Sequence, residues 1–207
     1  MEARDFSAVT PEIEALAAKS RENNRIDISL YDKYEVKRGL RDLNGKGVLT
    51  GLTEISEVKA SEVDENGVSH PCDGKLYYRG HDVEKLIEGF TKDKRFGFEE
   101  VTYLLLFGEL PDKKQLADFN ELLGNYRCIP PNFVRDIIMK KPSRDIMNAV
   151  ARSVLMLYAY DDKADDTSVP NVVRQSLQLI SELPLLAVYS LAGVEVPADM
   201  HGVSFLP

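Results

Sequence analysis

Two stretches of sequence carry most of the information about the fold: Lys75-Leu-Tyr-Tyr-Arg-Gly-His-Asp-Val-Glu-Lys-Leu86 and Phe98-Glu-Glu-Val-Thr-Tyr-Leu-Leu-Leu-Phe-Gly-Glu-Leu-Pro111. From Gly80 onward, apolar residues recur every three or four positions, which is the spacing of one face of an α-helix. These positions are Val83, Leu86, Ile87 and Phe90 for a first helix and Phe98, Val101 and Leu105 for a second. We therefore expect two helices that pack through these faces.

The residues before this point predict a small antiparallel sheet near residues 53–79. Apolar and polar residues alternate there, and Asn66-Gly67, a pair that favours a tight hairpin turn, stands between two such runs. A second turn-type pair, Asp73-Gly74, precedes Leu76-Tyr-Tyr78. The charged residues 31–41 and the glycine-rich segment that follows them are expected to form a loop.

Helical periodicity dominates the rest of the chain. Thr10 can cap the first helix, and Asp112 stands three residues before Gln115, which is the spacing of a capping box. Residues 169–191 form the longest and most apolar segment, so we expect it to be buried on more than one side. No repeat or long linker divides the sequence. It thus predicts a mostly α fold in a single unit, residues 1–207, with one small antiparallel β excursion.

Composition and charge argue against several classes of protein. With 43% hydrophobic residues, a chain of 207 residues can bury a substantial core. Its 34 acidic and 26 basic residues give a net charge of −8, which disfavours nonspecific binding to nucleic acid or anionic membranes. The N-terminus is charged, and no apolar run of about 18 residues suggests a membrane span. Cys72 and Cys128 fit free thiols in a reducing compartment, so we expect a cytoplasmic protein without nucleic-acid or membrane partners.

Two short runs invite a ligand-binding interpretation. Gly45-Lys-Gly-Val-Leu-Thr-Gly51 lacks the glycine spacing and the preceding buried strand of a phosphate loop, so a turn-rich connector is expected. Asp161-Asp-Lys-Ala-Asp-Asp166 has the oxygen ligands that magnesium prefers, but no second acidic cluster accompanies it. We expect a charged loop between helices that end near Tyr158 and begin near Val169. No metal site is predicted.

Three histidines are available for general acid–base chemistry: His70, His81 and His201. His70 lies among turn residues, so we expect its side chain at the surface. His81 directly follows Arg79-Gly80, where the entry to a helix and local hydrogen bonding account for it.

The two opening stretches resemble the start of the citrate synthase family, and the resemblance runs from about Lys37 to Tyr189. Gln178-Leu-Ile-Ser-Glu-Leu-Pro184 is similar to one helix of that family, and the order of glycine-rich approach, hairpin, Tyr-Arg-Gly, helix and Leu-Phe-Gly-Glu-Leu-Pro also agrees. The resemblance implies a citrate-synthase-like helical large domain, here incomplete. It also implies a homodimer that condenses acetyl-coenzyme A, a co-substrate, with oxaloacetate and water to give citrate and coenzyme A. No covalently bound cofactor is implied.

The family's catalytic carboxylate and two histidines belong to motifs C-terminal to the region of resemblance. We therefore expect the N-terminal part of a citrate synthase, inactive by itself and with no catalytic residue of its own. His201-Gly202 lies in a stretch, residues 191–207, that diverges from the family and does not reproduce the surroundings of a catalytic histidine. In the glycine-rich approach, the resemblance implies that Arg41 contacts the phosphates of coenzyme A. A solvated arginine is the alternative at that position.

Three other functions stay open. The chain could be one subunit of a split citrate synthase, with a separate polypeptide supplying the C-terminal catalytic half. It could be a non-catalytic helical module that binds partners through the surface that the family uses to dimerise. A magnesium-dependent prenyl diphosphate enzyme is the remaining alternative, and it would have to be stabilised by magnesium together with its substrate.

Overall fold

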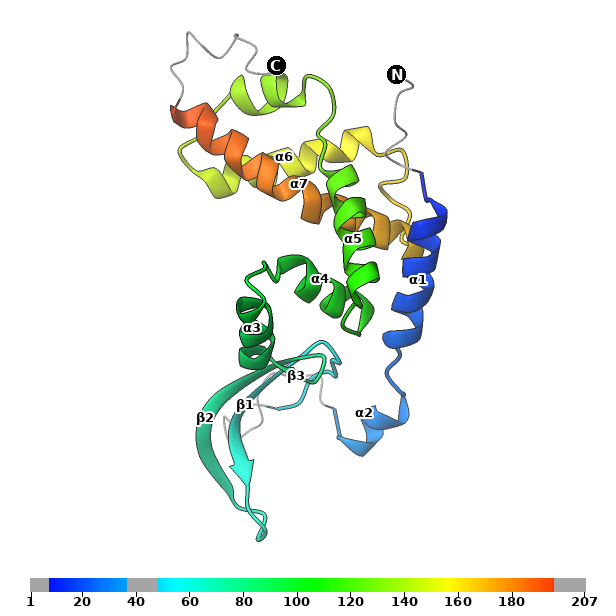
Figure 1. Cartoon of the computed structure of the whole chain (residues 1–207), viewed down its shortest axis with the longest axis vertical. Coiled ribbons are helices and arrows are strands. Elements are labelled where there is room, and N and C mark those ends of the chain that lie inside the picture. Colours follow the sequence, from blue (N-terminus) through cyan, green and yellow to red (C-terminus); the bar gives the residue numbers. More distant parts are fainter. Residues whose placement is uncertain (1–7, 37–47, 196–207) are drawn as a thin grey trace. The chain divides into compact units, whose positions relative to one another are not determined.

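The computed structural model describes residues 8–36 and 48–195, and it is mostly α-helical with one small antiparallel sheet, as the sequence predicts (Figure 1). The chain divides into two compact units. We call them the hairpin unit, Lys19–Ala117, and the helical unit, which joins residues 8–18 to residues 118–195. The assignment of residues 1–207 to a single unit stays a prediction.

The described part of the chain contains the following elements in order: α1 (Pro11–Asn23), α2 (Ser29–Lys33), β1 (Ser56–Val63), β2 (Ser69–Tyr78), β3 (His81–Asp82), α3 (Val83–Lys92), α4 (Phe98–Phe107), α5 (Lys113–Tyr126), a π-helical turn η1 (Val134–Met139), α6 (Ile146–Leu157), a 3₁₀ turn η2 (Tyr158–Tyr160) and α7 (Val169–Glu195). Residues 31–33 were expected in a loop and instead end the short helix α2. Asp27 starts this helix, because its carboxylate accepts hydrogen bonds from the backbone N–H (2.9 Å) and the hydroxyl (2.8 Å) of Ser29.

The predicted sheet is a hairpin of β1 and β2, with β3 added on the other edge of β2. Its turn contains Asn66-Gly67, and Gly67 takes the left-handed conformation (φ 79°) that a glycine adopts without strain. The second turn-type pair behaves differently. Asp73-Gly74 lies inside β2, at an irregularity where residues 72–74 stand between the pairs Lys59↔Lys75 and Ser61↔Pro71. The prediction of a turn there is wrong, because extra residues in one strand form a bulge rather than reverse the chain.

Helix α4 buries a different face from the one that its periodicity suggests. Tyr103, Leu104 and Phe107 are buried, whereas Phe98 is exposed. The helix is apolar on most sides, so spacing alone does not select the face that packs. Helix α3 has no fully buried residue. Asp82 caps its start, because its carboxylate accepts a hydrogen bond from the backbone N–H of Glu84 (2.9 Å).

Arg79 explains why the Tyr-Arg-Gly sequence stands between the hairpin and the helices. Its side chain is buried and donates hydrogen bonds to the carbonyl of Asn23 (3.3 Å), the side chain of Asn24 (2.5 Å) and the carbonyl of Leu105 (3.0 Å). The end of α1 and the end of α4 are thereby tied to the turn between β2 and β3. The role of this motif in the hairpin unit is therefore structural.

The predicted capping box at the start of α5 is confirmed. The backbone N–H of Gln115 donates to the Asp112 carboxylate, and the backbone N–H of Asp112 donates to the Gln115 side chain, both over 2.8 Å. Further along, α5 buries Phe119, Leu123 and Tyr126.

The helical unit is built around α6 and α7, which lie side by side and also contact η1 (Figure 1). Phe133, Ile138 and Leu186 form the centre of its core. Helix α7 continues through Pro184 to Glu195, so the first residues of the stretch expected to diverge from the family are helical.

By length and composition, residues 169–193 of α7 could cross a membrane. From the sequence, no segment was expected to be apolar enough to do so. Core helices of other proteins pass the same test. In this structure α7 buries the polar residues Asn171, Arg174, Ser181 and Glu182, and it packs against its neighbours in the helical unit. The expectation that the chain has no membrane partner stays a prediction.

Candidate functional site

A buried ion pair organises the start of α7. The guanidinium of Arg174 is fully buried and donates from Nη2 to the Asp161 carboxylate over 2.6 Å. It also donates from Nε to Asn171 Oδ1 (3.0 Å) and from Nη1 to Gln178 Oε1 (2.7 Å). Because a buried charge is costly unless it is paired and hydrogen-bonded, these contacts hold the guanidinium in place. The Asp161 carboxylate also accepts from Gln175 Nε2 (3.1 Å).

The acidic run Asp161–Asp166 forms the expected loop between η2 and α7, and its groups bond to the chain itself. Asn171 Nδ2 donates to the carbonyls of Lys163 (2.8 Å) and Asp166 (2.7 Å). The Tyr158 hydroxyl donates to the Asp165 carboxylate (2.9 Å), and this hydrogen bond raises the pKa of the tyrosine. In residues 8–36 and 48–195, no group of three or more His, Cys, Asp or Glu side chains is arranged to hold a metal ion.

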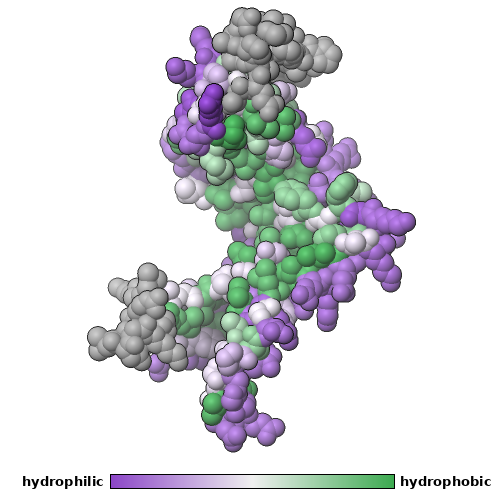
Figure 2. Space-filling view, turned by 90° about the vertical axis from the view of Figure 1, so that its left-hand side faces the viewer, coloured by the Kyte–Doolittle hydropathy of each residue, from purple (hydrophilic) through white to green (hydrophobic). Residues whose placement is uncertain are grey.

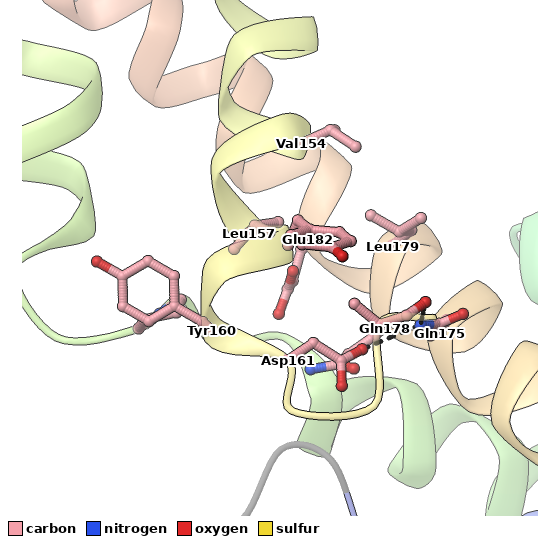
Figure 3. Close-up of a pocket in the computed structure, with 11 residues that line it drawn as sticks. Val154, Leu157, Tyr160, Asp161, Gln175, Gln178, Leu179 and Glu182 are labelled. Carbon is pink, nitrogen blue, oxygen red and sulfur yellow. Dashed lines mark hydrogen bonds between the residues drawn. The ribbon is translucent and has the colours of Figure 1, made fainter. Parts of the chain in front are cut away.

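A pocket of about 240 Å³ opens beside this network, between α6, η2 and α7 (Figure 3). Helix α7 supplies Gln175, Gln178, Leu179 and Glu182, whose spacing of three and four residues places them on one face of the helix. The remaining lining residues are Pro130, Val154, Leu157, Tyr158, Tyr160, Asp161 and Ala164. The pocket thus has an apolar wall from α6 and polar groups from α7 and the loop.

Glu182 is the unusual group of this pocket. Only 3% of the residue is exposed, and no side chain or backbone group in the described part of the chain makes a hydrogen bond to its carboxyl group. Burial disfavours the charged form, which raises the pKa of Glu182 from its ordinary value of 4.5 to about 7. A carboxyl group in this state can bind a cation or exchange a proton near neutral pH.

Of the residues that the sequence proposed for chemistry, Asp161 lines this pocket, whereas His70 and His81 do not. Arg41 and His201 lie outside the described residues. His70 is exposed on the hairpin, with Nε2 2.9 Å from the Asp64 carboxylate, and this contact lowers the pKa of Asp64. His81 is exposed in β3. Both histidines described by the structure therefore occupy surface positions in the hairpin unit.

Sequence reasoning missed Arg174 and Glu182. A signal was available, because both are ionisable residues within the longest apolar stretch of the chain. A charged residue on the buried side of such a helix needs a partner or a binding site. The structure treats the two residues differently. Arg174 pairs with Asp161, whereas no group in the described part of the chain forms an ion pair with Glu182.

Comparison with known proteins identifies the family. Residues 42–198, about three quarters of the chain, match the family model described as "Citrate synthase, C-terminal domain". The chain is 28% identical over 170 residues to 2-methylcitrate synthase 1 of Corynebacterium glutamicum, covering 81% of this chain and 39% of that protein. It is 30% identical over 144 residues to the citrate synthase of the same organism, covering 69% of this chain and 30% of that protein. The chain thus spans less than two fifths of the length of these relatives.

The structural comparison agrees at the level of the fold. The crystal structure of citrate synthase from Pyrobaculum aerophilum matches with a TM-score of 0.56 and 24% sequence identity, over 75% of this chain and 38% of that one. At this identity the likeness concerns the fold alone. Since the family model covers well over half of the sequence, the chain belongs to the citrate synthase family.

Proposed function

We propose that this chain provides the N-terminal scaffold for a citrate-synthase reaction, the condensation of acetyl-coenzyme A with oxaloacetate and water to give citrate and coenzyme A. The match of residues 42–198 to the family is the observation that carries the proposal. The similarity to the citrate synthase of Corynebacterium glutamicum supports the same reaction.

On this proposal, the 207-residue chain does not catalyse the reaction by itself. The reaction needs a carboxylate base and two acidic histidines, which is general acid–base chemistry combined with stabilisation of an enolate. The described histidines, His70 and His81, are exposed on the hairpin unit, and neither lines the pocket. The base and the acids would come from residues outside these 207, on a longer chain or on a separate polypeptide.

The release of the coenzyme A thiol tests this proposal. The chain would be assayed alone and after mixing with a separately prepared C-terminal portion of a family member. We expect activity only in the mixture. Turnover by the pure chain would refute the proposal.

The choice of thioester is part of the same proposal. The comparisons include both a citrate synthase and a 2-methylcitrate synthase at similar identity. A 2-methylcitrate carries one methyl group more than citrate, so its thioester would carry one more carbon in the acyl group. Assaying the mixture with acetyl- and propionyl-coenzyme A in parallel distinguishes the two.

Association into a dimer is also proposed. Exposed apolar side chains gather on the two central helices, with Met147 (81% exposed) and Leu155 (75%) on α6 and Val188 (64%) on α7. Figure 2 shows apolar surface over the helices and a mainly hydrophilic surface at the end of the hairpin. Contiguous apolar patches larger than a few hundred Å² mark protein–protein interfaces, and the proposal is that these side chains form such a patch.

Arg41 is proposed to contact the phosphates of coenzyme A, with a solvated arginine as the alternative. If the contact forms, Arg41→Ala should weaken binding of coenzyme A by about 1.5–3 kcal/mol, as expected for a charge-assisted hydrogen bond. Titration calorimetry on both proteins measures the difference, with Arg25→Ala as a control for the loss of one positive charge. Equal affinities of all three proteins would favour the solvated arginine.

A further inference from the structure

We propose that the pocket between α6, η2 and α7 binds a small organic cation, an ammonium or guanidinium group on a short apolar body, with the Glu182 carboxylate as its counter-ion. This inference goes beyond the proposed function, because acetyl-coenzyme A and oxaloacetate are both anions and a carboxylate would repel them.

The polar groups around the pocket leave Glu182 as the open position. Arg174 and Gln175 both donate to the Asp161 carboxylate, and Gln178 Oε1 accepts from Arg174. Figure 3 shows Glu182 on the same side of α7 as Gln178, Gln175 and Leu179, facing the α6 residues Val154 and Leu157. The one lining carboxyl group that the described residues leave without a hydrogen bond therefore borders the cavity.

Burial of the ionised Glu182 carboxylate is unfavourable unless a ligand pairs with it. An ionised carboxylate removed from water loses its hydration, and a positively charged group within contact distance restores much of that loss. A cation with N–H donors adds short charge-assisted hydrogen bonds. The apolar side chains of Val154, Leu157 and Leu179 would bury the body of the same ligand.

The volume limits the size of the ligand. The pocket holds about 240 Å³. An engineered apolar cavity of about 150 Å³ is large enough for benzene. Sites for drug-sized molecules range from about 300 to 1,000 Å³. A chain of four to six carbons or a single ring, carrying one cationic group, therefore fits the space.

Binding should depend on pH, because the cation pairs with the ionised form of Glu182. The other ionisable groups facing the pocket are Asp161, which is paired with Arg174, and the hydroxyls of Tyr158 and Tyr160. Burial places the pKa of Glu182 at about 7. Affinity for a cation should therefore be greater at pH 8 than at pH 6, and binding at the lower pH should release a proton.

The test uses four probes of one size on the 207-residue chain: n-butylammonium, butylguanidinium, 1-butanol and butyrate. Titrations followed by amide chemical shifts at pH 8 should show both cations binding about tenfold or more tightly than the alcohol, and butyrate not binding. The shifts should centre on α6 and α7. Equal binding of butylammonium and butanol would overturn the proposal, because the pocket would then recognise only the apolar body.

Variants connect the effect to one residue. Glu182→Gln keeps the shape of the side chain and removes its charge, so it should lose about tenfold or more in affinity for butylammonium while butanol binding stays unchanged. Glu182→Met, of similar volume, should behave in the same way, and circular dichroism checks that both variants fold. Glu121→Gln, which removes an exposed carboxylate from α5, should bind like the original chain.

A second copy of the chain is the alternative occupant, because a lysine or arginine side chain carries the same head group. Sedimentation of each variant, with and without butylammonium, separates the two possibilities. We expect the cation to leave the oligomeric state unchanged. Dissociation of an oligomer by butylammonium, or by Glu182→Gln alone, would show that a partner's side chain fills the pocket and would overturn the proposal.

Discussion

At the scale of single residues, Glu182 makes the stability of the helical unit depend on pH. Its pKa is about 7 when folded and 4.5 ordinarily, so between these values the folded chain retains a proton that the unfolded chain releases. The free energy of unfolding therefore falls as the pH rises through this window, by up to about 3 kcal/mol, and levels off above it. Urea unfolding at pH 5 and pH 8 measures the change.

The matched variants should separate this contribution from other titrating groups. Glu182→Gln should flatten the pH dependence and should be more stable than the original chain at pH 8. Glu121→Gln, at an exposed position, should keep the original slope. If Glu182→Gln retains the full pH dependence, then the buried carboxyl group is not its source.

Gly108 illustrates a requirement set by backbone geometry. It ends α4 with φ 80°, and its N–H donates to the carbonyl of Leu104 (2.8 Å). A Cβ atom at this position would lie 2.8 Å from Cβ of Asn23, whose side chain bonds to the carbonyl of Phe107. Gly108→Ala should therefore lower the free energy of unfolding by about 1–2 kcal/mol from the left-handed conformation alone.

Gly89 is the control for that substitution. It lies inside α3, its backbone is not left-handed, and an added Cβ would meet no atom within 4 Å. Gly89→Ala should raise the free energy of unfolding by about 0.5–1 kcal/mol, since alanine favours a helix over glycine. Urea titrations of both variants test the pair, and a stabilising Gly108→Ala would contradict this account of the α4 terminus.

At the scale of elements, the sequence predicts those features whose hydrogen bonds join residues close together in the chain. The capping box of Asp112 and Gln115 and the Asn66-Gly67 turn involve only residues up to four positions apart. The role of Arg79 was not predictable in this way, because its partners lie 26 to 56 residues away. The prediction of the packing face of α4 was wrong for a related reason. Several sides of this helix are apolar, and contacts with residues distant in the sequence determine which side is buried.

The apolar faces of α6 and α7 predict association. Replacing Leu155 with Glu places a charge on an exposed apolar side chain of α6, and the charge would be costly to bury in an interface. Light scattering at tens of micromolar should show a dimer or larger species for the original chain and a shift toward monomer for Leu155→Glu. Val58→Glu, at an exposed position on the hairpin, should leave the mass unchanged.

This prediction has a clear negative result. A monomer of the original chain at the same concentration would mean that the exposed apolar residues of α6 and α7 do not pair two copies. A shift caused equally by Val58→Glu would mean that charge, rather than the central helices, controls association.

At the scale of the whole molecule, the family and the helical class followed from sequence patterns, whereas the candidate site did not. The match of residues 42–198 places the chain in its family, and Arg79 of the Tyr-Arg-Gly motif donates hydrogen bonds within the hairpin unit. The pocket depends on a buried ion pair between Asp161 and Arg174 and on the burial of Glu182 against α6. The spacing of residues in a sequence does not show which side chains are buried. The sequence therefore reveals ionisable residues in an apolar helix, but it does not show which of them have a partner in the folded chain.

The measurement that tests the central claim most directly is the release of the coenzyme A thiol by the pure 207-residue chain with acetyl-coenzyme A and oxaloacetate. Removing one general acid or base commonly costs about 10²- to 10⁴-fold, so a scaffold without the full set should show no rate above background. A complete citrate synthase, assayed in parallel, establishes the sensitivity. We predict no citrate formation by the chain at any concentration tested. A steady rate that scales with the concentration of pure protein would contradict the proposal that this chain serves as a scaffold alone.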